Sequence, residues 1–321
     1  DFYLFFDNFK VGSIDGYVYL NDTDAWTPST PVGNSGNTDK ITIASNASNP
    51  SLSGLTTAGN LEIYANSVLS VEDVLDLDGD IFNDGQIVFK STATKTAQLD
   101  VFSGTITGEH GTVQTERFIP SGTNDKRAFR LVSSAVDAGS IYDNWQEGGA
   151  SPAGFGTHIT GSTTGANGLD QTSTGTESMF TFNNAETNQG TVSAWQPVTN
   201  TSGTNLIAGV PYRLFVRGDR NIDLASNAST PNNTVLRATG SLKTGTVSAG
   251  TLNQSEGWFS FIGNPYQAIV NVNDLSFTGD VNQSFIYAWD PNANDNGAFI
   301  TIELPAGTNA GSNPNVDNFL Q

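Results

Sequence analysis

The chain has 321 residues, of which 13 are lysine or arginine and 32 are aspartate or glutamate, so its net charge is −19. This acidity argues against nucleic acid and anionic membrane surfaces as partners, because both attract clusters of basic side chains. The chain contains no cysteine, which excludes disulfide bonds, thiolate chemistry and cysteine-ligated zinc.

Strand patterns follow one another along most of the chain. No long segment repeats apolar positions with helical spacing between capping residues. No apolar run approaches the ~18 residues that a membrane-spanning helix needs. Short runs of β-branched and aromatic residues are separated by glycine, asparagine, aspartate and proline, which predicts an all-β protein. The clearest predicted strands are Tyr17–Leu20, Ile41–Ile43, Gln86–Phe89, Tyr212–Val216, Trp258–Phe261 and Phe299–Ile302.

A weak repeat with a spacing of 20 runs through the first third of the chain, at Ile41, Leu61, Ile81 and Val101. Each coil of a solenoid turns at polar corners and points one or two apolar side chains of each short strand inward. The pattern favours a short parallel β-helix over residues 17–116, with an ordinary meander of hairpins as the alternative. The expected inward pairs and polar corners are Leu69/Val71, Leu75/Leu77, Ile87/Phe89, Asn60, Asn66, Asp78–Asp80 and Asn83–Gly85.

The composition changes after about residue 111. Aromatic and basic strands at residues 115–120 and 127–132 are followed by loops rich in glycine, serine and threonine. Strands of the type found in sandwiches then continue to the end of the chain. We therefore expect a domain boundary near residue 116 and a jelly-roll-like β-sandwich over residues 117–321, truncated at its C-terminal end.

An ordered series of motifs, mostly in the second half of the chain, carries a resemblance to a known group of proteins. The motifs are Glu116–Pro120, Arg127–Ser134, Asn144–Gly148, Gly154–Gly161, Ala208–Arg220, Phe261–Gln267 and Tyr287–Pro291. Together they resemble a module of large secreted, cell-surface proteins of Bacteroidota, which are typically exported by the type IX secretion system. Short β-helical segments precede this module in the family, so the resemblance covers about residues 40–321.

The resemblance implies an extracellular location on a bacterial cell surface. It also implies that residues 1–16 are the last strand of a preceding jelly-roll module, and that further strands and a sorting domain follow residue 321. The expected partners are other modules of the same long chain, with polysaccharide and components of the secretion system as further candidates. The family suggests a location and an architecture rather than a reaction.

Candidate catalytic residues are few. His110 and His158 are the two histidines of the chain, and neither belongs to a nucleophile-elbow or zinc-protease motif. We interpret both as loop residues. Glu147 lies close to Trp145, a pairing that a glycoside hydrolase uses when a carboxylate works beside a ring stacked on sugar. The sequence does not show whether a second carboxylate faces Glu147. We therefore expect no enzymatic activity, with a glycoside hydrolase that uses Glu147 as the minority alternative.

Residues 292–303 have the ligand spacing of a calcium-binding EF-hand loop. The matching positions are Asn292, Asn294, Asn296, Gly297 and Glu303. However, the first position is not aspartate, and the residues after the glycine alternate as in a strand. A glycine-closed hairpin therefore explains the segment better than calcium does. The acidic corner at residues 76–80 is a second calcium candidate, for which a solvated turn is the preferred explanation.

Seven of the 13 basic residues fall in two short stretches that also contain aromatic residues. They are Arg117, Lys126, Arg127 and Arg130 in the first stretch and Arg213, Arg217 and Arg220 in the second. One hypothesis is a groove for an acidic polysaccharide, in which Trp145, Arg213 and Arg217 bind the ligand. The alternative that we prefer places the two strands side by side and pairs their arginines with acidic residues. Those acidic residues are Glu116, Asp125 and Asp219.

The sequence thus predicts a non-catalytic stalk or adhesion segment of a large bacterial surface protein, built from a β-helix and a β-sandwich. The alternative function is that of a carbohydrate-binding module attached to a secreted polysaccharide-degrading enzyme. Calcium is the one cofactor that the residues suggest.

Overall fold

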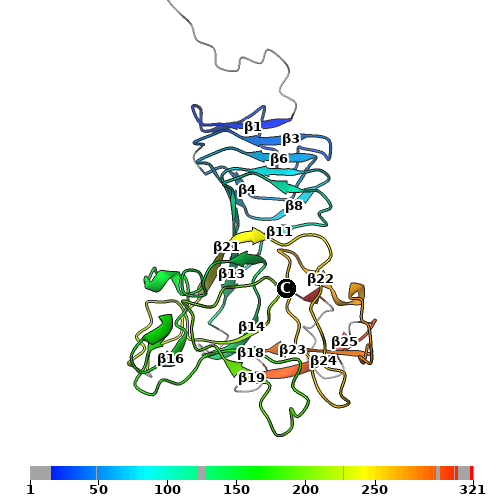
Figure 1. Ribbon diagram of the computed structural model, residues 1–321. Helices are drawn as coiled ribbons and strands as arrows, with labels where there is room; N and C mark the ends of the chain where they lie inside the picture. Colours follow the sequence, from blue (N-terminus) through cyan, green and yellow to red (C-terminus); the bar gives the residue numbers. More distant parts are fainter. Residues whose placement is uncertain are drawn as a thin grey trace, which may run out of the picture.

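The computed structural model describes residues 16–47, 49–121, 127–226, 228–291, 293, 297–306, 308–309 and 319–320. As predicted, these residues form an almost entirely β protein, in which a narrow stack of coils stands on a broader C-terminal region (Figure 1). The helices among them are three 3-10 helices, η1 (Glu147–Gly149), η2 (Ala166–Gly168) and η3 (Val272–Asp274). In the described part of the chain, no helix has the length and apolar character needed to cross a membrane.

The N-terminal stack is a parallel β-solenoid of about four turns, which confirms the predicted β-helix. Its strands are β1 (Tyr17–Leu20), β2 (Ala25–Thr27), β3 (Lys40–Ile43), β4 (Ser51–Leu52), β5 (Thr56–Ala58), β6 (Asn60–Ile63), β7 (Val68–Val71), β8 (Val74–Leu77), β9 (Ile81–Asn83), β10 (Gln86–Phe89), β11 (Gln98–Leu99), β12 (Ile106–Thr107) and β13 (Thr112–Ile119). They form three parallel faces, in the orders β12-β9-β6-β3-β1, β13-β10-β7-β4 and β11-β8-β5. β2 adds to the first face as an antiparallel partner of β1.

Apolar side chains stacked from coil to coil form the core of the solenoid. Ile41 lies beside Leu61, and Leu61 lies beside Ile81, so the predicted spacing is correct for three coils. These three side chains are at most 1% exposed. The predicted inward pairs on the other two faces are also buried. Because such burial contributes about 25 cal/mol per Å² of apolar area, the repeated layers together hold the coils in place.

The predicted fourth position of this column, Val101, is wrong. Its side chain is 89% exposed, and the residue that pairs with Ile81 is Ile106, which is itself 36% exposed. The cause is an insertion between β10 and β11, where Ser91 and Thr96 form a bridge across a small turn. The inserted residues delay the next strand along the sequence, so a constant spacing selects a residue outside the core.

Polar corners are hydrogen-bonded from one coil to the next. Asn66 Nδ2 donates to Asn46 Oδ1 across 3.2 Å, and both residues have left-handed backbone, with φ of 61° and 59°. Asparagine adopts this conformation more readily than most residues. Asn60 Oδ1 accepts from the backbone N of Asp80 at 2.7 Å. Asp80 Oδ1 in turn accepts from the backbone N and Oγ1 of Thr105, both at 2.8 Å. The corners thus satisfy their polar groups within the stack.

β13 joins the solenoid to the C-terminal region. It extends the second solenoid face by pairing in parallel with β10, and it pairs antiparallel with β21 (Thr234–Leu242) from Val113 to Ile119. Both strands lie at the neck between the two regions (Figure 1). The boundary predicted near residue 116 therefore falls inside a strand that belongs to both regions.

The C-terminal region distributes its strands over several sheets. Besides β21, they are β14 (Ala128–Val132), β15 (Val136–Ala138), β16 (Thr160–Ser162), β17 (Asp170–Gln171), β18 (Met179–Phe182), β19 (Trp195–Pro197), β20 (Tyr212–Val216), β22 (Val270–Asn271), β23 (Phe285–Asp290), β24 (Ala298–Glu303), β25 (Thr308–Asn309) and β26 (Phe319–Leu320). The largest antiparallel sheet has the order β14-β20-β18-β19, and β15 pairs with β21. Phe129 of β14 lies opposite Phe215 of β20, so the two basic stretches are neighbours, as expected. The predicted β-sandwich is not confirmed by this arrangement and stays a prediction.

The strand predicted at Trp258–Phe261 is wrong, because the structure assigns this segment to no strand. Side-chain amides take the place of a neighbouring strand. Asn184 accepts from the backbone N of Phe261 and donates to its carbonyl, at 2.8 and 3.0 Å. Gln189 bonds in the same way to Phe259, at 2.9 and 2.8 Å. The backbone of Phe259 and Phe261 is thus hydrogen-bonded by side-chain amides and not by a neighbouring strand.

Candidate functional site

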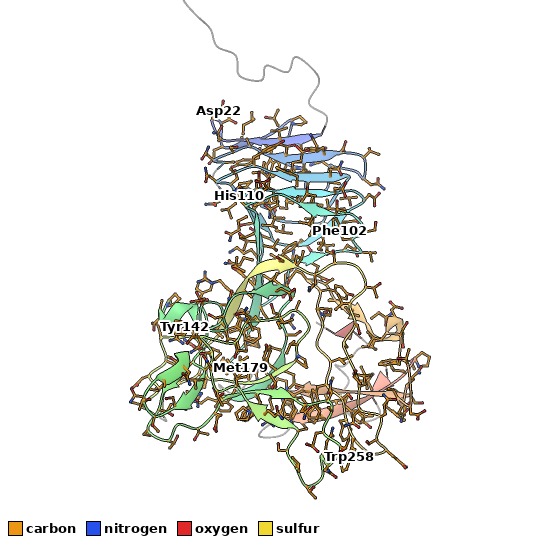
Figure 2. The ribbon with its side chains drawn as sticks, viewed as in Figure 1. Asp22, Phe102, His110, Tyr142, Met179 and Trp258 are labelled. Carbon is orange, nitrogen blue, oxygen red and sulfur yellow. The ribbon has the colours of Figure 1, made fainter. Side chains whose placement is uncertain are left out.

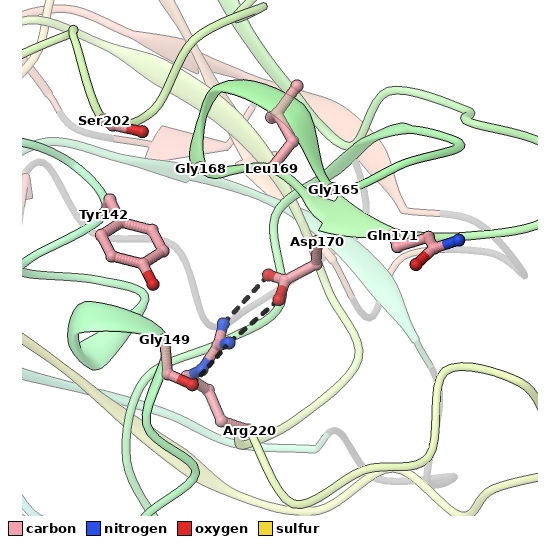
Figure 3. Close-up of a pocket in the computed structure, with 9 residues that line it drawn as sticks. All are labelled: Tyr142, Gly149, Gly165, Gly168, Leu169, Asp170, Gln171, Ser202 and Arg220. Atoms are coloured by element: carbon pink, nitrogen blue, oxygen red, sulfur yellow. Dashed lines mark hydrogen bonds and ion pairs between the residues drawn. The ribbon is translucent and has the colours of Figure 1, made fainter.

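A buried ion pair holds together the glycine-rich loops of the C-terminal region (Figure 3). Arg220, in the turn after β20, donates two hydrogen bonds of 2.9 Å to the carboxylate of Asp170 in β17. Its other N–H groups donate to the carbonyls of Ala150 at 2.6 Å, Thr157 at 3.1 Å and Gly149 at 3.5 Å. All five donors of the guanidinium are therefore used, and they connect separate loops to one carboxylate.

Asp170 is equally well bonded. Its Oδ2 also accepts from Nε2 of the fully buried Gln146 at 2.8 Å. Its Oδ1 lies 3.3 Å from Nδ1 of His158, whose Nε2 lies 3.0 Å from the carbonyl oxygen of Ile222. Burial alone would raise the pKa of Asp170, but the hydrogen bonds from His158 and Arg220 hold this pKa well below its ordinary range. The carboxylate is therefore ionised and fully engaged at neutral pH.

A shallow cavity of about 520 Å³ opens beside this ion pair. Its lining residues are Tyr142, Gly149, Gly165, Gly168, Leu169, Asp170, Gln171, Ser202 and Arg220. In Figure 3 the guanidinium of Arg220 points at the carboxylate of Asp170. Both charges are satisfied by each other and by loop backbone, so the pair connects the loops. His158 is part of this network, and His110 lies at an exposed corner of the solenoid.

The two residues of the hydrolase hypothesis take structural positions. The carboxylate of Glu147 accepts from Nε of Arg237 at 3.1 Å and also from its Nη2. The Arg237 guanidinium lies over the ring of Phe155, 4.0 Å from its centre. Trp145 is 3% exposed and packs edge-on against Tyr212, with ring centres 5.6 Å apart. Neither side chain is presented at a surface where a sugar chain would meet both.

The predicted ligand-binding arginines lie among aromatic rings. The guanidinium carbon of Arg213 is 4.5 to 4.7 Å from three ring centres. Those rings are Phe129, Phe180 and Trp195. Arg217 lies over Phe215, 4.9 Å from its centre. Burial lowers the pKa of both guanidinium groups. Each arginine thus has cation–π partners within the protein, which gives it a packing role.

The preferred alternative, charge pairing of these arginines, is wrong in its partners among the described residues. Glu116 binds Lys90 at 2.9 Å. Asp219 accepts from the backbone N of Gly154 and Asn221, at 2.7 and 3.0 Å. Asp125, the third expected partner, lies outside the described residues, as does Lys126. Spacing along the sequence could not show that backbone N–H groups, rather than arginines, would donate to the carboxylate of Asp219.

A larger cavity, of about 780 Å³, lies at the junction of the two regions. Its walls come from the loop before β11, from β13, β14 and β21, and from residues 264–269. Two arginines, Arg117 and Arg130, line it together with aromatic side chains. The aromatic side chains are Phe118, Trp145, Tyr266 and Trp289. The sequence grouped the two arginines by their closeness in the chain. It contained no signal that the C-terminal segment folds back to meet them.

Most of the predicted calcium site lies outside the described residues, because Asn292, Asn294 and Asn296 belong to that part of the chain. Glu303 is an exposed residue at the end of β24, opposite Phe285 of β23. Within the part that the structure describes, no three His, Asp or Glu side chains gather to hold a metal ion. Calcium binding therefore stays a prediction.

Comparisons with models of known protein families, with curated proteins and with solved structures found no match. The resemblance to secreted proteins of Bacteroidota therefore stays a prediction from motifs.

Proposed function

We propose that this chain is a non-catalytic stalk or adhesion segment of a large extracellular bacterial protein, which holds other modules at a fixed distance. The observation that carries the proposal is the continuous junction between the solenoid and the C-terminal region. β13 is hydrogen-bonded to strands of both regions. A stalk must transmit orientation from one end to the other. A shared strand does so because bending it would break backbone hydrogen bonds on both sides.

A second attachment closes the base of the solenoid. The backbone N of Leu99 in β11 donates to the carbonyl of Gln267 at 2.8 Å, and Gln267 Nε2 donates to the carbonyl of Ala97 at 2.6 Å. The backbone N of Ile269 donates to Gln98 Oε1 at 3.0 Å. The last coil of a solenoid needs a cap, because its apolar layer would otherwise face solvent. A segment of the C-terminal region supplies part of that cap.

The ion pairs formed by two carboxylates of the C-terminal region also support a non-catalytic role. Glu147 is bonded to Arg237, and Asp170 is bonded to Arg220. The extracellular location is proposed from the motif resemblance. The net charge of −19 suits a segment exposed to solvent, because like-charged copies repel one another.

The proposal predicts that the distance between the two ends of the molecule varies little. Because the chain has no cysteine, the double variant Asp22→Cys, Gln196→Cys can be spin-labelled at two exposed sites. Asp22 lies at the free end of the stack (Figure 2), and Gln196 lies on β19. We expect a single narrow distance distribution by double electron–electron resonance.

A control pair within the solenoid sets the width expected of a rigid body. Asp22→Cys combined with Glu72→Cys serves this purpose, because both side chains are exposed on the same stack of coils. A distribution for the Asp22–Gln196 pair that is much broader than this control, or that has two maxima, would contradict a rigid stalk.

A further inference from the structure

The cavity at the junction is lined by two arginines, of which Arg130 is buried and Arg117 is partly buried. Arg117 alternates with Val113 and Thr115 on β13, and therefore lies on the face that continues the solenoid core. Arg130 of β14 lies opposite Leu214, a fully buried residue of β20. Both arginines line the cavity of about 780 Å³, a size that suits a small ligand.

Arg117 has no hydrogen-bond acceptor or carboxylate partner of its own in the described part of the chain. The adjacent carboxylate, Glu116, is bonded to Lys90 at 2.9 Å. Asp73, which also lines the cavity, is bonded to Lys95 at 2.6 Å. Burial lowers the pKa of the Arg117 guanidinium, because partial removal from water disfavours its charged form. A bound anion would offset this unfavourable desolvation.

Arg130 is bonded to carbonyl groups. It donates to the carbonyl of Pro120 at 3.0 Å and to that of Phe129 at 3.4 Å. Burial lowers the pKa of Arg130, and the carboxylate of Asp290 opposes this effect. Asp290 is thus a negative charge near Arg130, while Arg117 adds a second positive charge to the same cavity. The residues that line the cavity thus include three basic and two acidic side chains.

Aromatic side chains complete the wall of the cavity. Trp289 is fixed there by its Nε1, which donates to the carbonyl of Phe129 at 2.9 Å. Tyr266 and Phe118 also contribute to the lining. Aromatic faces attract the C–H groups of a sugar ring, and a guanidinium binds a carboxylate through two parallel hydrogen bonds. Arginine and aromatic side chains in one cavity suit a ligand that has both features.

We propose that the junction cavity binds an acidic sugar, with Arg117 holding its carboxylate and Arg130 contributing a second positive charge. The site differs from the one suggested by the sequence, because Trp145 lines this cavity whereas Arg213 and Arg217 do not. The proposal goes beyond the stalk function, since a stalk needs no ligand. It gives the carbohydrate-binding alternative a defined location.

The test is isothermal titration calorimetry of the full chain with a trimer of galacturonic acid. The neutral galactose trimer is the matched ligand control. Arg117→Gln removes the proposed carboxylate partner. Lys243→Gln is the matched protein control, because it removes one positive charge from an ion pair with Asp137 outside the cavity. Far-UV circular dichroism establishes that each variant is folded, and Arg117→Lys replaces Arg117→Gln if the latter does not fold.

We expect the galacturonate trimer to bind and the neutral trimer not to bind. Arg117→Gln, or Arg117→Lys in its place, should weaken binding at least tenfold, whereas Lys243→Gln should change it less than twofold. Equal affinity for the neutral trimer, unchanged affinity in the Arg117 variant, or no binding of the acidic trimer would each overturn the proposal. None of these results affects the distance measurement that tests the stalk.

The source of the acidic sugar is distinguished by ligand length. If galacturonate monomer and trimer bind equally to the full chain, the cavity takes a free acidic sugar. If the trimer binds more tightly, the cavity takes a segment of an acidic polysaccharide. Both results support the proposed chemistry, provided that the Arg117 variant weakens binding.

Discussion

The solenoid and the C-terminal region are stabilised by different kinds of interaction. In the solenoid, each coil repeats an apolar layer, and ion pairs such as Lys40–Glu62 are partly exposed. In the C-terminal region, long loops converge on the buried pair of Asp170 and Arg220. There Arg213 also lies within a cage of aromatic rings.

This difference follows from repetition. Stacked coils satisfy one another's backbone groups through parallel ladders, so apolar layers are enough to define their geometry. Loops have no such ladders, and their buried backbone groups still need partners. Arg220 and Asp170 supply those partners, because one guanidinium and one carboxylate together reach several chain segments. This contrast predicts where the free energy of unfolding falls most. In the C-terminal region the loss of a buried charge should lower it most, and in the solenoid the loss of a buried apolar side chain.

The largest effect is expected from Asp170→Asn. This change leaves the guanidinium of Arg220 buried without its counter-charge, which should lower the free energy of unfolding by about 3–5 kcal/mol. Urea unfolding followed by tryptophan fluorescence measures the loss. The solenoid control is Glu62→Gln, which removes the partly exposed partner of Lys40 and should cost about 1 kcal/mol or less. Equal losses of unfolding free energy in the two variants would mean that the ion pairs of the two regions contribute equally to stability.

A slightly smaller effect is expected from Leu61→Ala in the core of the solenoid. Leu61 is fully buried, so the cavity left by truncation should cost about 2–5 kcal/mol of unfolding free energy. Val101→Ala is the matched control, because that side chain is 89% exposed and its loss should change stability by less than about 0.5 kcal/mol. Urea unfolding followed by far-UV circular dichroism compares them. A large loss in Val101→Ala would mean that Val101 belongs to the core.

The smallest expected effect is a dependence on acidic pH in the C-terminal region. The folded protein holds the pKa of Asp170 below its ordinary value, whereas the unfolded chain protonates this carboxylate near pH about 4. Stability from Asp170 is therefore fully present above that pH and is lost as the pH falls toward the folded-state pKa.

The measurement compares urea midpoints of the wild type and of Asp170→Asn between about pH 7 and pH 2. We expect the advantage of the wild type to shrink as the pH falls below about 4, because protonation then removes the charge that the variant already lacks. A constant difference over this range would mean that hydrogen bonding to Asp170 does not favour its ionised form.

Prediction of the candidate site from the sequence was much less complete than prediction of the fold class. Glu147 and Trp145 formed a plausible catalytic pair by proximity, yet one is bonded to Arg237 and the other is buried on Tyr212. Charge alone did not distinguish Arg117, which lines the junction cavity, from Arg213, which lies within an aromatic cage. The distinction depends on the partners that the fold brings to each strand.

The amino-acid sequence by itself determined the all-β class and the register of the first coils. Alternation and polar corners are local patterns, and Ile41, Leu61 and Ile81 follow them at constant spacing. Only the tertiary structure decided which residue pairs with Ile81 in the next coil, which partners surround each arginine, and which segment closes the base of the solenoid. Each of these depends on contacts between residues far apart in the chain, such as that of Gln267 with Leu99, and local spacing does not contain this information.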